Sequence, residues 1–263
     1  MLGIGTSVTS IDPGQIYKEL SELESYASLA IHFDFSTLTG VHGSEVTAAT
    51  NLVAGGSAFN ISTNSGTPSL DRNGFGGRSS VAFQTGGDYL NLGREFTSSN
   101  KSFTFFVVLQ RDDTEDLAII GSSESEGITN YIKFIASGTR IETVMGEEET
   151  GEATTLNSTS GSTVDYTQVA GVPSVLVIRR ETNGVLHVHA DNGLYIAGND
   201  SGGMKSATNF RLLTIGGNVG HHPSTTYDGN IGEVGIYDAD IGVQRAITLS
   251  KELSTKWGVN RRS

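Results

Sequence analysis

The chain has 263 residues, enough for a single core that buries about three quarters of the surface exposed by the unfolded chain. It contains no cysteine, which excludes a disulfide framework and any thiolate metal site. The 17 basic residues against 29 acidic ones give a net charge of −12, which opposes binding to nucleic-acid phosphates and anionic lipids. The first residues lack the basic and apolar regions of a secretory signal, and no stretch approaches the ~20 apolar residues of a membrane span. We therefore expect a soluble protein whose partners include neither nucleic acid nor membrane.

Residues 1–29 predict an N-terminal arm that contains a helix. Asp12 is suited to cap this helix, and Pro13 suits its first turn. Three apolar residues fall on one face of it: Ile16, Leu20 and Leu23. This face packs either on the chain's own core or on a partner molecule, and both readings stay open.

Residues 30–263 predict one domain built from short strands. Apolar runs recur between turns rich in Ser, Thr and the 34 glycines. The predicted strands are 30–35, 79–83, 88–92, 102–109, 117–121, 131–136, 140–144, 174–179, 186–190, 194–196, 211–215 and 231–237. The run 102–109 is nearly continuous in Phe and Val, as expected of a strand covered on both faces. Many short strands with few helices predict an all-β sandwich or barrel.

Two polar stretches and a second helix complete the pattern. Residues 146–162, which carry four glutamates, and residues 199–209 are predicted to be exposed loops. The helix runs from about Val243 to Lys256 and ends at Gly258. Trp257, the only tryptophan, follows this helix, so we interpret it as a core anchor and not as a sugar-stacking platform.

Several strand and turn motifs occur in a recognisable order. They are GGRSSVAF (76–83), GDYL (87–90), FTFFVV (103–108), PSVLVIR (173–179), LHVHADNG (186–193), LTIGG (213–217), YDGNIGEV (227–234) and KWG (256–258). The series resembles the concanavalin A-like lectin/glucanase superfamily, in its laminin-G-like branch, over about residues 30–260. The resemblance implies a two-sheet antiparallel jelly-roll sandwich. With the two helices predicted above, the expected fold is this sandwich with an N-terminal helix and a short C-terminal helix. The imperfect alternation after Ile231 also predicts a bend or bulge near Gly232.

The superfamily contains lectins, glycosidases, adhesion modules and viral coat or fibre components, so the fold does not decide the function. The related glucanases carry a Glu-x-Asp-x-x-Glu pattern on one strand, and this sequence has none. Glu233 and Asp238 are five residues apart and would face opposite ways on an unbroken strand. We find no nucleophile-elbow or phosphate-loop motif either. We therefore expect a protein that is not an enzyme.

No cofactor is expected, although two short motifs offer hard oxygen ligands for calcium. The motifs are DRNG (71–74) and DNG (191–193), and both are also good turn sequences, which is the interpretation we favour. His187 and His189 share one strand face without an evident third ligand, so we interpret them as partly buried or interface residues. The adjacent pair His221 and His222 is not expected to converge on one ion.

The resulting hypothesis is a non-catalytic structural or adhesion protein on a bacteriophage particle, as a capsid decoration, tail or fibre component. Residues 1–7 resemble the opening of virion structural proteins from marine bacteriophages. Such a protein is expected to be a homo-oligomer at the virion surface, in contact with other virion proteins, with surface glycans, or with both. The alternative is a free, secreted carbohydrate-binding lectin module, and a glycoside hydrolase ranks third. Three loop aromatics are the candidate ligand-binding residues: Tyr166, Tyr195 and Tyr227.

Overall fold

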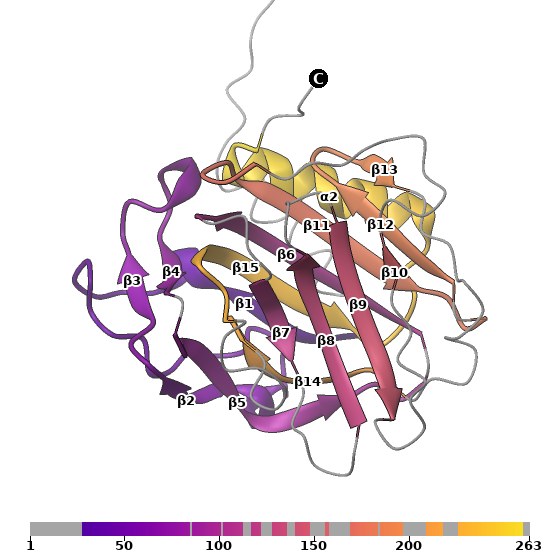
Figure 1. Ribbon diagram of the computed structural model, residues 1–263, viewed down its shortest axis with the longest axis horizontal. Helices are drawn as coiled ribbons and strands as arrows, with labels where there is room; N and C mark the ends of the chain where they lie inside the picture. The colour runs from indigo at the N-terminus through magenta and orange to yellow at the C-terminus, as the bar shows by residue number, and fades with distance from the viewer. Residues whose placement is uncertain are drawn as a thin grey trace, which may run out of the picture.

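The computed structural model describes most of the chain from residue 28 to residue 259. The described residues are 28–84, 86–100, 102–112, 117–121, 128–135, 140–147, 156–157, 169–183, 185–196, 209–217 and 226–259. Within them, two antiparallel sheets pack face to face, and one α-helix lies against one of the sheets (Figure 1).

The first sheet, sheet A, has eight strands. In spatial order they are β13 (Leu194–Ile196), β12 (Leu186–Ala190), β11 (Ser174–Arg180), β6 (Phe103–Arg111), β15 (Gly229–Tyr237), β4 (Ser80–Phe83) and β3 (Ser69–Asp71), with β1 (Leu29–Asp34) also paired to β15. The first half of β15 pairs with β4 and the second half with β1. The first and last strands described are therefore neighbours in the sheet.

The second sheet, sheet B, has seven strands. In spatial order they are β10 (Leu156–Asn157), β9 (Arg140–Glu147), β8 (Ile128–Ile135), β7 (Leu117–Gly121), β14 (Arg211–Ile215), β5 (Tyr89–Thr97) and β2 (Ile61–Ser65). Three short 3-10 helices lie in the connections: η1 (Phe35–Thr37), η2 (Ser57–Phe59) and η3 (Phe75–Gly77).

Strand β6 shows how the sequence builds two apolar layers. Phe105 and Val107 point into the main core between the sheets, whereas Phe106 and Val108 belong to a second cluster under the helix. All four side chains are buried, which confirms the prediction of a strand covered on both faces.

Helix α2 (Val243–Trp257) covers the outer face of sheet A. Gly258 ends it with φ of 65°, a left-handed conformation that glycine adopts without strain. Trp257 is fully buried and packs on Phe75, which confirms its interpretation as a core anchor. The register of β15 shifts at Gly232. A Cβ at this position would lie 2.5 Å from Cη2 of Trp257, which explains why the residue is glycine.

The structure confirms the all-β two-sheet sandwich, the C-terminal helix and each predicted strand. Strands β2, β3 and β10 were not predicted; β2 is largely polar and β10 has only two residues. The prediction of a loop over 146–162 is wrong in part, because β9 extends to Glu147 and β10 falls within that stretch. The predicted N-terminal helix lies outside the described residues. In the part of the chain that is described, no helix is long and apolar enough to cross a membrane.

Candidate functional site

The three tyrosines predicted to bind a ligand do not form a site among the described residues. The prediction is wrong for Tyr227, whose side chain is fully buried in the main core with its ring edge-on to Phe83. Tyr195 lies in β13, where its backbone pairs with His189 of β12, but its side chain is not among the parts of the chain that the structure describes. Tyr166 also lies outside the described residues.

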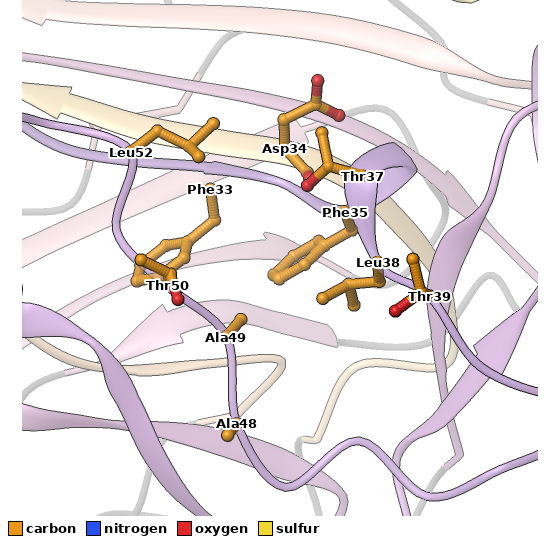
Figure 2. Close-up of a pocket in the computed structure, with 10 residues that line it drawn as sticks. All are labelled: Phe33, Asp34, Phe35, Thr37, Leu38, Thr39, Ala48, Ala49, Thr50 and Leu52. Atoms are coloured by element: carbon orange, nitrogen blue, oxygen red, sulfur yellow. The ribbon is translucent and has the colours of Figure 1, made fainter.

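The candidate site is a pocket of about 350 Å³ at the edge of the sandwich, beside η1. We call it the η1 pocket; its lining residues are Phe33, Asp34, Phe35, Thr37, Leu38, Thr39, Ala48, Ala49, Thr50 and Leu52. One wall comes from the end of β1 and from η1, and the other from the segment 48–52 (Figure 2). The segment spans from sheet A to sheet B, because the backbone of Leu52 bonds to His32 and that of Ala49 to Ile61.

The walls of the η1 pocket combine hydrocarbon with hydroxyl groups. Figure 2 shows the rings of Phe33 and Phe35 on the side of β1 that faces the segment 48–52. The two rings stack 6.1 Å apart and are almost fully buried, so they form the floor and not an open platform. Leu52, by contrast, is 41% exposed. Three exposed threonines lie at the rim: Thr37, Thr39 and Thr50.

Asn51 holds the segment 48–52 against β1. Its Oδ1 accepts from the backbone N–H of His32 at 2.9 Å, and its Nδ2 donates to the carbonyl of Ala30 at 3.0 Å. A second bond from Nδ2 reaches the carbonyl of Gly56. One buried side chain therefore covers the outer edge of β1 and fixes the loop that forms the second wall.

Asp34 connects the η1 pocket to a buried charged network. Its Oδ1 accepts from the backbone N–H and the hydroxyl of Ser36, which caps η1. Its Oδ2 accepts from Nζ of Lys256 at 2.8 Å. The same Nζ donates to Oε2 of Glu233 at 2.7 Å, and this oxygen also accepts from Nε1 of Trp257. The network joins β1, β15 and α2 on the outer side of sheet A.

Glu233 is ionised at the centre of this network. Its burial alone would raise its pKa, but the hydrogen bond from His32 and the charge of Lys256 outweigh burial and lower the pKa to about 2. Burial likewise opposes the charge of Lys256, yet Glu233 and Asp34 raise its pKa above the ordinary value. Because an ionised carboxylate only accepts, Nε2 of His32, 2.8 Å from Oε1, must carry the hydrogen.

Glycoside hydrolysis requires two neighbouring carboxyl groups. Asp34 and Glu233 are such a pair, because both bind the ammonium group of Lys256. Hydrolysis needs one carboxyl group with a raised pKa to protonate the leaving oxygen. The pKa of Glu233 is shifted the other way, and its side chain is 1% exposed. This pair is therefore arranged to hold α2 on the sheet and not to transfer a proton.

Both candidate calcium motifs serve as turns. Oδ1 of Asp71 accepts from the backbone N–H of Asn73, and Asp191, Asn192 and Gly193 form a turn with positive φ angles. Among the described residues, no group of three His, Cys, Asp or Glu side chains could hold a metal ion.

The histidines of β12 are buried or partly buried. His187 lies 2.8 Å from Glu181, and His189 is fully buried, where burial and the charge of Arg179 lower its pKa to about 4. This agrees with their interpretation as partly buried residues. His221 and His222 lie outside the described residues.

No family model matches this chain, and no curated protein matches it in sequence. Solved structures do resemble it. The binding domain of Paraclostridial Mosquitocidal Protein 1 has a TM-score of 0.58 at 11% identity over 88% of this chain. Domain 4 of AbnA, an extracellular arabinanase of Geobacillus stearothermophilus solved with arabinotriose, has a TM-score of 0.54 at 13% identity over 85%. Trypanosoma rangeli sialidase, solved with sialic acid, has a TM-score of 0.56 at 11% identity over 94%.

The extent of these matches differs between the neighbours. The match spans 98% of the arabinanase domain, but 55% of the toxin binding domain and 39% of the sialidase. At such identities the likeness establishes the β-sandwich fold, which is the fold of carbohydrate-binding domains among the neighbours. The function has to be argued from the residues of this chain.

Proposed function

We propose that this protein is a non-catalytic carbohydrate-binding domain and that the η1 pocket holds the sugar. The observation that carries the proposal is the mixed lining of the pocket, with aliphatic walls below a rim of threonine hydroxyls. A sugar ring presents the same mixture, because its C–H faces are apolar and its edge carries hydroxyls. Ligand sites in general combine apolar walls with a few placed polar groups.

The size of the pocket also fits this proposal. Its volume of about 350 Å³ is at the lower end of the ~300–1,000 Å³ typical of ligand sites, which suits a short sugar unit. The buried network behind Asp34 supports the non-catalytic part, since Glu233 cannot donate a proton near neutral pH. The fold shared with the arabinanase domain is a suitable scaffold for such a site.

The test is a glycan array, run with calcium and then with a chelator, followed by calorimetric titration of each hit. Ala48→Trp places a bulky ring in the pocket, and Ala58→Trp is the matched control, because Ala58 is also exposed but lies outside the pocket. We expect saturable binding that Ala48→Trp abolishes and Ala58→Trp preserves. A blank array, or equal loss in both variants with the fold intact, would contradict the proposal. If a chelator abolishes glycan binding, the binding requires calcium.

A finer proposal places this domain on a bacteriophage particle as part of a homo-oligomer. It is supported by the resemblance of residues 1–7 to virion structural proteins. Mass spectrometry of purified particles and light scattering of the full chain test it. A chain that is absent from particles and monomeric at all concentrations would contradict it.

A further inference from the structure

The charges around the η1 pocket suggest which class of sugar it accepts, a step that rests on the proposed function. Of the ten residues that line the pocket, Asp34 is the only charged one, and it is negative. The rim threonines are neutral donors and acceptors. The lining therefore offers hydrogen bonds to hydroxyl groups but no cation to a carboxylate.

The nearest cation that the structure places behind this wall is already engaged. Nζ of Lys256 lies between the carboxylates of Asp34 and Glu233, and its side chain is 2% exposed. The group formed by His32, Asp34, Glu233 and Lys256 has a net charge of −1, or of zero if His32 is protonated. In neither state does the wall present positive charge to the pocket.

We infer that the η1 pocket binds neutral sugars and rejects sugars that carry a carboxylate. An acidic sugar would bring a negative charge into a pocket whose lining offers it no cation, and desolvating an unpaired charge is costly. The net charge of −12 on the chain adds a long-range repulsion that depends on salt. Neutral sugars meet neither penalty.

Matched sugar pairs separate charge from shape. Glucose and glucuronic acid differ only at C6, as do galactose and galacturonic acid. For the pair whose neutral member binds, we expect the acidic member to bind at least tenfold more weakly at low salt, which corresponds to about 1.4 kcal/mol. Raising the salt concentration should narrow this ratio.

A gain-of-function variant tests the electrostatic cause. Thr50 is exposed at the rim and makes no contact with the charged network, so Thr50→Lys adds a cation without disturbing the fold. Thr50→Gln is the matched control for side-chain size. We expect Thr50→Lys to reduce the neutral-to-acidic ratio at least threefold and Thr50→Gln to leave it unchanged.

The outcomes distinguish the two proposals. If the neutral sugar binds and its acidic partner binds as tightly, the selectivity is overturned while carbohydrate binding stands. If both Thr50 variants leave the ratio unchanged, the electrostatic origin is overturned. If no pair member binds, the proposed function is overturned and the selectivity with it.

Discussion

Replacing Lys256 by methionine should test the buried network most directly. The substitution keeps a long unbranched side chain but removes the ammonium that lies 2.8 Å from Asp34 and 2.7 Å from Glu233. Removing one partner of a buried ion pair typically costs about 3–5 kcal/mol, because the remaining charge is left uncompensated. Two buried carboxylates lose their partner here, so we expect Lys256→Met to lose at least about 3 kcal/mol of unfolding free energy at pH 7.

The pH dependence of this loss has a definite sign. In the unaltered protein the pKa of Glu233 falls from 4.5 to about 2, so its contribution of about 3 kcal/mol is present above pH 4.5 and is lost between pH 4.5 and 2. Without Lys256, burial still raises the pKa of Glu233 and His32 still lowers it, so the pKa rises from about 2 towards values at which the burial effect, the largest single one, dominates. A carboxyl group whose folded pKa is raised binds protons more tightly in the folded state. The deficit of Lys256→Met should therefore shrink as the pH falls from 8 to 5.

Urea unfolding at pH 5, 6, 7 and 8 measures both effects. Trp257 fluorescence and far-UV circular dichroism should give coincident transitions if unfolding is two-state. Lys251→Met is the control, because Lys251 is exposed on the same helix and should change the unfolding free energy by less than about 0.5 kcal/mol. A loss below about 1 kcal/mol at pH 7, or a deficit that stays constant from pH 5 to 8, would refute the reasoning.

Three further substitutions test the packing around the site by urea unfolding. Asn51→Ala leaves four backbone groups without their partner, two of them in buried bonds, and should cost about 3 kcal/mol. Asn64→Ala, which loses one exposed bond, should cost under about 1 kcal/mol, and similar losses in the two variants would contradict the role of Asn51. Gly232→Ala should cost about 1–3 kcal/mol because its Cβ would meet the ring of Trp257, and the cost should fall in a Trp257→Phe background; an unchanged cost would exclude the ring as the cause. The pKa of His189 is lowered from 6.5 to about 4, so its contribution of up to about 3 kcal/mol is complete above pH 6.5 and is lost towards pH 4. His189→Gln should flatten the stability curve in that window, and an identical curve would show that another group titrates there.

Local pattern was enough to predict most of the fold. Strands with alternating or continuous apolar residues, such as β6 and β11, bury at least one face. The hydrophobic pattern of the sequence predicts these strands because it follows from that burial. Strand β2, with the sequence ISTNS, escaped prediction because only its first residue is buried. It forms because its backbone pairs with β5 at the edge of sheet B. This pairing depends on a distant strand and does not require apolar residues in β2 itself.

The charged network behind the candidate site was not predicted, and for a similar reason. His32 and Asp34 lie about two hundred residues from Glu233 and Lys256, and only the pairing of β1 with β15 brings them together. Tyr227 illustrates the opposite error. An aromatic residue beside a turn motif suggests an exposed platform, but Tyr227 lies two residues before β15 and points into the core. The type of a residue shows whether its side chain could bind a ligand, but only the fold determines whether that side chain is exposed to one.

The two carboxylate oxygens of Asp34 make the pocket depend on the helix. Oδ1 caps η1, which supplies Thr37 to the pocket wall, and Oδ2 is held by Lys256 near the end of α2. A shift of α2 would release Oδ2 and allow the carboxylate to rotate, which would weaken the cap of η1. We therefore expect the position of α2 to affect the cap of η1 and, through it, the wall of the η1 pocket.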